Sequence, residues 1–434
     1  MAGDWIEAPF PEVVDFQEGP GILAKDFCEE GVPLIRLSGL DRGASVLAGC
    51  NYLDPETVAK RWSHFALARG DILLSTSASL GRIAVVSDEA IGAIPYTGII
   101  RMRPRDERLV PSFIRYLLEG PDFQRQAEMV GVGSVIRHFG PMHLREMTVT
   151  LPPATEQRAI AHILGALDGK IEINRRMSET LEAIARALFK SWFVDFDPVR
   201  AKAEARDPGL PRPIADLFPD RFEDSALGEI PEGWAVCGLD TIAQFLNGLA
   251  LQKYPPDSGR SLPIIKIAQL RTGNTEAADR ASADLDSAYI VEDGDVLFSW
   301  SGSLACVLWA GGRGALNQHL FKVTSQRFPK WFYYNWIQQH LSGFRHIAAG
   351  KATTMGHIQR HHLSEALVVA PAPKILVAAD RQIAPLVDSV VRNAVQCRTL
   401  AALRDLLLPK LISGELRIEN VEGIVRNFEV PQSA

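Results

Sequence analysis

The feature that most constrains the fold of this chain is an internal repeat. Val32–Leu37 (VPLIRL) is similar to Leu262–Ile267 (LPIIKI), and Gly70–Leu80 (GDILLSTSASL) is similar to Gly294–Leu304 (GDVLFSWSGSL). Four later residues recur with the same spacing, since His138, His143, Leu144 and Pro152 match His357, His362, Leu363 and Pro371. The matches keep their order along the chain, so the sequence predicts two related domains in tandem.

Each repeat ends in a long stretch with the apolar spacing of a coiled-coil helix. In residues 155–193, a strict seven-residue series runs through Ile160, Leu167, Asn174, Leu181 and Leu188. In residues 379–412, apolar residues alternate at spacings of three and four. The two stretches therefore predict a pair of long helices that pack antiparallel.

One asparagine interrupts the apolar seam of each predicted helix. When the two repeats are aligned, Asn174 falls on Asn393. A polar residue on an apolar seam costs stability and fixes the register of the helices, so we expect the two asparagines near each other at mid-length. The alternative is that both lie at a solvated edge of the helix pair.

The rest of the chain predicts short elements. Residues 197–231 contain six prolines, which excludes long helices and central strands and predicts a surface linker at the domain boundary. Apolar runs such as Ile72–Leu74 and Val296–Phe298 predict strands, and short helices are expected near Pro111 and Pro329. The predicted fold class is α+β, with two tandem α/β domains separated by two long helices that form an antiparallel coiled coil.

Composition places the chain among folded proteins, because 47% of its residues are hydrophobic and 23% are charged. The start shows no basic cluster followed by an apolar run, and no stretch approaches the roughly 18 to 20 apolar residues of a spanning helix. Five cysteines without a CxxC pair are typical of reduced thiols. We therefore expect a soluble, cytoplasmic protein.

Charge is distributed unevenly along the sequence. The formal net charge of −6, taken alone, argues against a nucleic-acid binder, which needs a basic face for phosphates. However, residues 60–145 hold twelve basic and eight acidic residues, and residues 296–364 hold seven Lys or Arg and six of the ten His, without Asp or Glu. Positive charge concentrated in two segments is compatible with DNA binding.

The sequence lacks the motifs of several enzyme classes. It has no GxxxxGK[ST], HExxH or GxSxG, and no Asn/Asp-Pro-Pro-aromatic tetrapeptide of the kind with which amino-methyltransferases hold a flipped base. His357 and His361 stand at helical i, i+4 spacing with His362 adjacent, but no nearby carboxylate or cysteine completes a metal set. We therefore expect no catalytic residues and no metal in this chain.

Loops at matching places in the two repeats carry hydrogen-bond donors. Small hydroxyl residues approach phosphates closely, and an arginine on the same loop can bind a guanine edge. The candidate DNA-binding residues are Ser75, Ser77, Ser79, Arg82, Arg137, His138, Ser299, Ser301, Ser303, Lys351, Thr353, Thr354 and His357. The alternative for the serine runs is a hairpin turn. Four aromatic residues either stack on bases or form the core face of a helix: Trp331, Tyr333, Tyr334 and Trp336.

The centre of the chain resembles a known family. Specificity subunits of type I restriction-modification systems share a central conserved region similar to residues 151–198, LPPATEQRAIAHILGALDGKIEINRRMSETLEAIARALFKSWFVDFDP. The resemblance continues at Ile230–Trp234 (IPEGW) and at Leu403–Ile418 (LRDLLLPKLISGELRI). These stretches carry the strong match, whereas the layout is similar along nearly the whole chain.

The resemblance implies two target-recognition domains that each read one half of a bipartite DNA site and are held apart by conserved helices. The implied parts are target-recognition domain 1 at 1–154, the central conserved helix at 155–196, the proline-rich linker at 197–230, target-recognition domain 2 at 231–373, the C-terminal conserved helix at 374–418 and a tail at 419–434. Because the two domains differ outside their framework, we expect an asymmetric site with unlike halves.

The resemblance also implies partners. They are double-stranded DNA, two modification subunits that methylate adenine with S-adenosylmethionine, and ATP-driven restriction subunits, and no membrane. S-adenosylmethionine, ATP and Mg are expected on those subunits, and this chain is expected to bind no cofactor and to be no enzyme. Four aromatic residues either cap the core or dock a modification subunit: Phe189, Trp192, Phe193 and Phe196.

Two other functions stay open at this point. A coiled-coil scaffold that does not bind DNA would leave the basic segment 296–364 unexplained. A methyltransferase in its own right would bind S-adenosylmethionine, against which the absent motifs argue.

Overall fold

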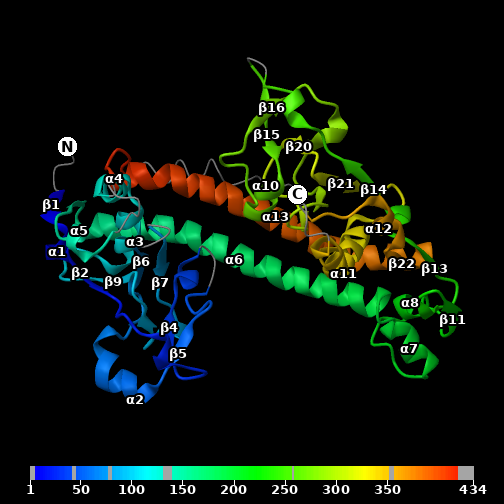
Figure 1. The fold of residues 1–434 in the computed structure, drawn as a ribbon, viewed down its shortest axis with the longest axis horizontal. Helices are drawn as coiled ribbons and strands as arrows, with labels where there is room; N and C mark the ends of the chain where they lie inside the picture. Colours follow the sequence, from blue (N-terminus) through cyan, green and yellow to red (C-terminus); the bar gives the residue numbers. More distant parts are fainter. Residues whose placement is uncertain are drawn as a thin grey trace. The chain divides into compact units, whose positions relative to one another are not determined.

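The computed structural model describes residues 5–41, 45–76, 81–130, 139–256, 259–350 and 356–418. The chain forms two compact units (Figure 1). The first contains Met1–Glu172 and Leu400–Ala434, and the second contains Ile173–Thr399. Each unit therefore holds one of the two repeats and a part of each long helix.

The first unit contains a four-stranded antiparallel sheet. Its order is β2 (Val14–Glu18), β9 (Ile99–Pro104), β6 (Ile72–Ser75) and β7 (Ile83–Val85). All four residues of β6 are buried, because this strand is inside the sheet and has apolar side chains on both of its faces. Burial on both faces explains why β6 reads as a continuous apolar run rather than an alternating one.

A second sheet and a strand pair complete the strands of the first unit. The sheet has the order β3 (Phe27–Cys28), β5 (Asn51–Leu53), β4 (Val32–Ile35) and β8 (Ile94–Pro95). Within it, β4 and β8 are parallel and the other pairs are antiparallel. The strand pair joins β1 (Ile6–Pro9) to β10 (Thr148–Leu151), the strand that leads into the first long helix.

The second unit repeats the strand order of the β2–β9–β6–β7 sheet, whereas its other sheet has a different order of strand pairing. One sheet has the order β14 (Gln244–Asn247), β21 (Leu320–Thr324), β18 (Val296–Ser299) and β19 (Cys306–Leu308). The other has the order β16 (Arg280–Ser282), β15 (Ser261–Ile265), β20 (Gly314–Leu316) and β17 (Ile290–Val291), with β15 and β20 parallel. The strand pair is β13 (Ala235–Gly238) with β22 (Leu367–Ala370).

Strand register establishes which residues of the central strand pairs are equivalent in the two copies. Ser75 pairs with Ile99 in the first unit, and Ser299 pairs with Leu320 in the second. Gly98 and His319, which directly precede Ile99 and Leu320, therefore occupy equivalent positions in the two units. The prediction of two tandem α/β domains is confirmed.

Shorter helices lie where prolines predict their starts. The segment α3 (Pro111–Glu119) has proline at its first position, and α4 (Pro121–Val130) follows it directly. In the second repeat, α11 (Lys330–Ala349) begins after Pro329. Trp331, Tyr333 and Trp336 are at most 5% exposed on this helix, which favours the core alternative over base stacking for its aromatic face.

The two long helices, α6 (Ala154–Phe193) and α13 (Pro373–Ile412), pack together in antiparallel fashion within each unit. In the first unit, Asp168 pairs with Arg404 at 2.7 Å. In the second, the side-chain amide of Asn174 donates to Oε1 of Gln396 at 2.7 Å. From Asp168 to Asn174 the residue number rises along α6, whereas from Arg404 to Gln396 it falls along α13, so the two helices are antiparallel. The predicted fold class is confirmed.

Asn174 is 1% exposed, so it does not lie at a solvated edge. Its partner Gln396 lies three residues after Asn393 on α13. The joint role of Asn174 and Asn393 in fixing the register stays a prediction.

The proline-rich segment forms short elements, as expected: α7 (Asp197–Ala203), α8 (Arg212–Ala215), and the hairpin of β11 (Phe222–Ser225) with β12 (Gly228–Pro231). However, it is not only a surface linker. Val199 and Phe218 are buried in the main hydrophobic cluster of the second unit together with Trp192 and Trp234. Aromatic burial, which proline spacing does not report, makes this segment part of that core.

Among the described residues, none of the helices combines the length and the apolar character that crossing a membrane requires.

Candidate nucleic-acid interface

Two buried serines close the base of equivalent loops. In the second unit, Ser299 Oγ accepts from the Ala305 amide at 2.8 Å and donates to the Ser303 carbonyl at 2.8 Å. In the first unit, Ser75 Oγ accepts from the Arg82 amide at 3.0 Å. Both serines are 0% exposed. They hold the two ends of each hairpin loop together, so the prediction that Ser75 and Ser299 contact DNA is corrected in favour of the hairpin alternative.

Beyond Ser299, the loop carries a cluster of aromatic and polar side chains. Ser301 Oγ lies 3.1 Å from Nδ1 of His319 and is 3% exposed. Ser301 and His357 form a β-bridge, so the loop before α12 (Arg360–Glu365) is paired with the loop after β18. The ring of Trp300 lies 5.8 Å from that of His319 and 6.3 Å from that of His357. The structure thus brings together Ser301 and His357, which the sequence proposed separately.

Asn247 and Gln318 also belong to this cluster, and the sequence analysis did not single them out. The indole Nε1 of Trp300 donates to Asn247 Oδ1 at 2.9 Å and to the Gln318 carbonyl at 3.2 Å. Gln318 Nε2 lies 3.3 Å from Nε2 of His319. Asn247 is exposed at the end of β14, and Gln318 is half-buried in the loop before β21. No local motif marks either residue, because their neighbours are set by the strand order.

The remaining candidates divide into two groups. Ser303 is exposed, and Arg82 forms an ion pair with Asp41. The other predicted residues lie outside the described part of the chain: Ser77, Ser79, Arg137, His138, Lys351, Thr353 and Thr354.

Equivalent histidines cap equivalent short helices. At α5 (Pro141–Leu144), the Gly140 amide donates to Nδ1 of His143 at 3.0 Å. At α12 (Arg360–Glu365), the Gln359 amide donates to Nδ1 of His362 at 2.9 Å. A nitrogen that accepts from an amide carries no proton, so the neutral ring carries its proton on Nε2. The recurrence of His143 as His362 therefore has a structural reason.

Three potential metal ligands lie on α12. Contrary to the sequence expectation, a carboxylate is near, because ligating atoms of His361, His362 and Glu365 lie within 4.8 Å of one another. A metal-binding histidine normally donates its second N–H to a neighbour, whereas Nδ1 of His362 already accepts an amide and leaves the proton on Nε2. The capping role of His362 thus works against its use as a ligand.

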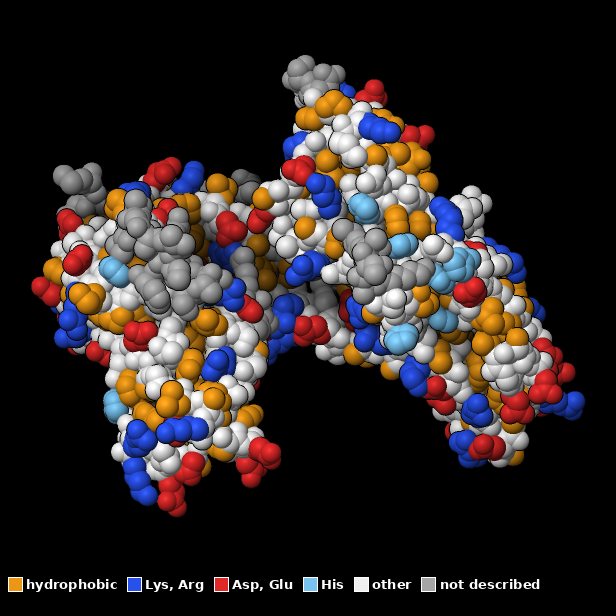
Figure 2. All heavy atoms as spheres, viewed as in Figure 1, with side chains coloured by type: hydrophobic (Ala, Val, Ile, Leu, Met, Phe, Trp, Pro, Cys, Tyr) orange, Lys and Arg blue, Asp and Glu red, His pale blue; other side chains and the backbone are white. Residues whose placement is uncertain are grey.

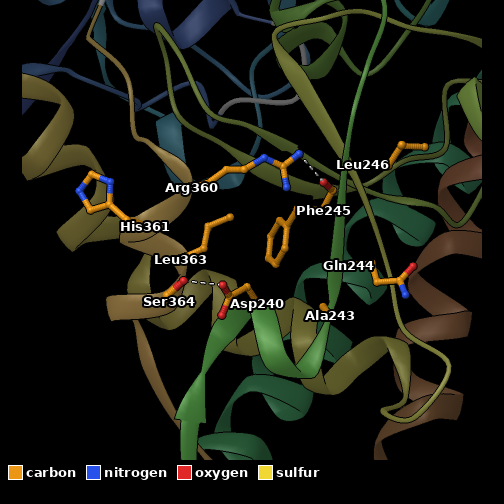
Figure 3. A pocket seen from close by; sticks show the side chains of 9 residues that line it. All are labelled: Asp240, Ala243, Gln244, Phe245, Leu246, Arg360, His361, Leu363 and Ser364. Atoms are coloured by element: carbon orange, nitrogen blue, oxygen red, sulfur yellow. Dashed lines mark hydrogen bonds between the residues drawn. The ribbon is translucent and has the colours of Figure 1, made fainter.

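A pocket of about 530 Å³ opens beside α12, next to α9 (Leu239–Ile242) and β14. Figure 3 shows His361 at its side and the Arg360 guanidinium directed toward the Phe245 carbonyl, to which it donates at 3.3 Å. Ser364 donates to Asp240 at 2.5 Å across the lower part of the pocket. Figure 2 shows histidine side chains gathered on the face of the second unit that carries α11 and α12.

In the second unit, an ion pair and a hydrogen bond tie the loop that carries Asp293 and the helix α11 to α13. Arg398 binds both carboxylate oxygens of Asp293, at 2.8 and 2.7 Å, which lowers the pKa of Asp293 and raises that of Arg398. The indole of Trp331 donates to Asp380 at 2.8 Å. A bidentate arginine pair has a defined geometry, so the sheet loops are held at a fixed place on the helix.

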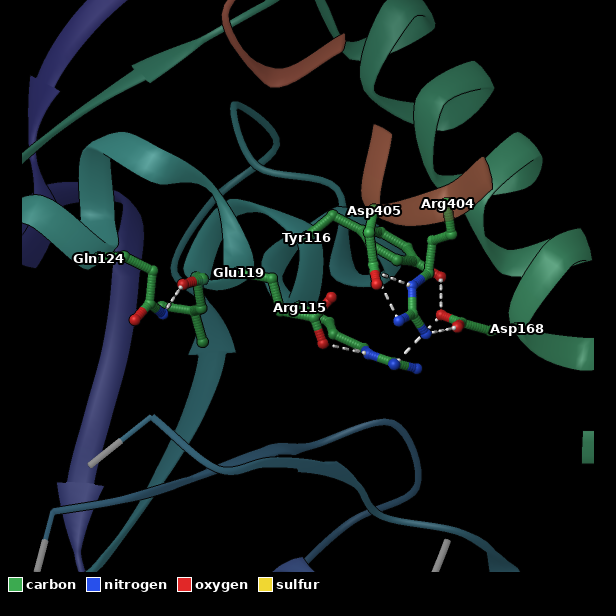
Figure 4. Close-up of polar contacts among 8 residues, drawn as sticks. Arg115, Tyr116, Glu119, Gln124, Asp168, Arg404 and Asp405 are labelled. Atoms are coloured by element: carbon green, nitrogen blue, oxygen red, sulfur yellow. Dashed lines mark hydrogen bonds and ion pairs between the residues drawn. The ribbon is translucent and has the colours of Figure 1, made fainter. Parts of the chain in front are cut away.

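In the first unit, a network centred on Asp168 does the same (Figure 4). Asp168 on α6 accepts from Tyr116 of α3 at 3.1 Å and pairs with Arg115 at 3.1 Å, as well as with Arg404. Burial, followed by the charge of Asp168, raises the pKa of Tyr116 well above its usual 10.0. For Arg404, burial opposes the charge, but hydrogen bonds to Asp168 and Asp405 outweigh it and raise the pKa.

The aromatic residues at the end of α6 lie in the core. Phe189, Trp192, Phe193 and Phe196 are at most 7% exposed. Phe193 packs against Trp331 and Phe332 of α11, with ring centroids 5.6 and 5.5 Å apart. Side chains with so little exposed surface offer a partner subunit almost nothing to contact, so the core alternative replaces the predicted docking role.

Comparisons with known proteins agree on one family. Residues 3–183 match the model of the type I restriction modification DNA specificity domain. The chain is 24% identical over 402 residues to the type I restriction enzyme HindI specificity subunit of Haemophilus influenzae, covering 81% of this chain and 87% of that protein. It is 25% identical over 374 residues to the MjaIX specificity subunit of Methanocaldococcus jannaschii, covering 84% and 82%.

One solved structure shares the fold. The crystal structure of the type I restriction-modification S subunit from M. genitalium aligns with a TM-score of 0.57 and 13% identity, covering 94% of this chain and 96% of that one.

Proposed function

We propose that this chain, which is similar to the specificity subunits of type I restriction-modification systems, is the non-catalytic DNA-recognition subunit of such a complex. In this role it reads an asymmetric bipartite site in double-stranded DNA and positions the modification and restriction subunits. The relatives are named as specificity subunits, and we assign that role to this chain by proposal.

The observation that carries the proposal is that two domains built on the same four-stranded antiparallel sheet present unlike chemistry at equivalent loops. The second domain has Trp300 and His319 where the first has Thr76 and Gly98. Unlike side chains at the same place on the same frame suit two different half-sites. A scaffold that does not bind DNA needs no such difference.

Anchoring to the helices supports the positioning role. Each domain is tied to a long helix of its own unit, by the Asp168 network or by the Asp293–Arg398 pair. A helix of 40 residues is about 60 Å long at 1.5 Å per residue, so these helices suffice to separate two half-sites on a duplex.

The proposed docking surface for modification subunits is on α6. Ile173, Met177 and Ile184 are 56%, 46% and 44% exposed and fall on one face of the helix, four and then seven residues apart. Exposed apolar side chains in a row are typical of interaction surfaces. S-adenosylmethionine, ATP and Mg are proposed to bind the partner subunits, so the purified chain should bind no S-adenosylmethionine in a calorimetric titration.

Methylome mapping tests the proposed function. The chain is expressed with its modification subunits in a host without other adenine methyltransferases, and methylated adenines are located by long-read sequencing. The expected result is one asymmetric motif of two unlike parts with a fixed gap. A continuous motif, a palindrome, or methylation that does not depend on this chain would contradict the proposal.

A further inference from the structure

We propose that Asn247 and Gln318 together read an adenine in the half-site bound by the second domain. The inference rests on the DNA recognition proposed above and names two specificity-determining residues and the base they recognise.

The amide of Asn247 has a fixed orientation. The indole N–H of Trp300 is a donor only, and it lies 2.9 Å from Oδ1 of Asn247. The oxygen of the amide must therefore face the indole, which turns the Nδ2 donors away from it. Because Asn247 is exposed at the end of β14, these donors point to where a ligand can approach.

The amide of Gln318 is oriented by a chain of hydrogen bonds. Its Nε2 can only donate, so the 3.3 Å contact makes Nε2 of His319 the acceptor. The proton of the neutral imidazole is then on Nδ1, which donates to Ser301 Oγ at 3.1 Å. This arrangement turns the acceptor Oε1 of Gln318 away from His319.

A glycine brings the two amides together. At Gly248, a Cβ atom would lie 2.2 Å from the carbonyl oxygen of Asn317, so only glycine permits this crossing of the chain. On the other side of this crossing, the main-chain N–H of Gln318 donates to the Leu249 carbonyl at 2.9 Å. Oδ1 of Asn247 and the main-chain carbonyl of Gln318 consequently accept from the same indole, which leaves Nδ2 of Asn247 as a donor and Oε1 of Gln318 as an acceptor for a ligand.

A donor beside an acceptor matches adenine. In the major groove, adenine presents the N7 acceptor and the N6 donor, whereas guanine presents two acceptors. Asn247 Nδ2 would bind N7, and Gln318 Oε1 would accept from N6. In the first domain, the equivalent residues are Glu18 and Thr97. Glu18 already accepts from the Gly98 amide at 3.1 Å and has no amide donor for N7, so the proposed recognition of adenine is restricted to the second domain.

The test compares methylomes of complexes that contain Asn247→Asp or Gln318→Ala. Asn247→Asp keeps an acceptor for the Trp300 indole but removes the donor to N7. We expect discrimination at one adenine of one half-site to fall by about tenfold to a hundredfold in both variants, with the other half-site unchanged. Gln339→Ala, an exposed glutamine on α11, is the control and should leave the motif unchanged.

Two outcomes separate the levels of the proposal. If both variants keep the thermal stability and the full motif, and only lower methylation uniformly, the two side chains contact phosphates and the adenine reading is overturned. If the unmodified chain gives no bipartite motif, the proposed function itself fails.

Discussion

Asp168 of α6 and Arg404 of α13 form an ion pair of 2.7 Å in which the side chains are only 15% and 7% exposed. Asp168 also accepts from Tyr116 of α3, so a single carboxylate joins both long helices to the domain of the first unit. Because these two charges are poorly hydrated, water cannot compensate for the loss of a partner side chain, and each charge therefore depends on the other.

Arg404→Ala should therefore lower the free energy of unfolding by about 3 kcal/mol, since the Asp168 charge stays buried without its main partner. Urea denaturation followed by circular dichroism measures the loss. Arg175→Ala is the matched control, because Arg175 forms an exposed i, i+4 pair with Glu179 and should cost less than about 0.5 kcal/mol. Equal losses in the two variants would show that the Asp168 network is not a special anchor.

Ser299→Ala should destabilise the second domain by about 1 kcal/mol, because the half-buried Ala305 amide loses its acceptor. Hydrogen exchange at the Ala305 amide should become faster by a corresponding factor. The control is Ser303→Ala, since Ser303 accepts through its main-chain carbonyl and its own side chain is exposed. Unchanged exchange at Ala305 would remove the stapling role.

His340 should make stability fall in acid. Burial lowers the pKa of His340 below its usual 6.5, and its Nε2 donates to the Leu367 carbonyl at 3.0 Å. The unfolded chain then takes up protons before the folded chain does, so the free energy of unfolding decreases as the pH falls through 6.5 toward the lower folded value. Denaturation midpoints between pH 8 and pH 5 measure the slope, and His340→Asn should flatten it; an unaltered slope would assign it to other groups.

Met177→Asp should separate docking from folding. Met177 is 46% exposed on α6, so the change should alter the free energy of unfolding by less than about 0.5 kcal/mol while reducing co-elution with modification subunits. Leu227→Asp, at a residue 48% exposed on the β11–β12 hairpin, is the control and should keep co-elution intact.

Phe193→Ala gives the contrasting result. Because Phe193 is 0% exposed, the truncation should cost about 3–5 kcal/mol, and any loss of partner binding would follow from unfolding. Normal co-elution of Met177→Asp would remove the proposed docking surface.

The framework of this fold is well predicted by local sequence patterns. Repeated apolar runs predict β6 and β18, and the seven-residue series through Leu167 and Leu181 predicts α6, because both depend on spacing along the chain. The helix α13 begins at Pro373, six residues before the apolar spacing that starts at residue 379 and one residue before the start that the family resemblance implies, and it passes through Pro385. Packing along α6 outweighs the missing hydrogen bond at that proline.

The candidate interface is less predictable. Ser75 and Ser299 look like surface hydroxyls in sequence, but strands buried on both faces give no alternation from which their burial can be inferred. Asn247 and Gln318 are far apart in sequence, and only the pairing of β14 with β21 brings them to one indole. Residues that act together through strand order leave no local signal.

The two buried serines have a further consequence for how such a protein diversifies. Because Ser299 secures the base of its loop from inside the sheet, the exposed loop residues Gly302 and Ser303 contribute little to the folded core. New side chains can be installed there while the frame stays intact. If the chain reads DNA as proposed, a change of its preferred target in one half-site would require only a few replacements at such exposed loop positions.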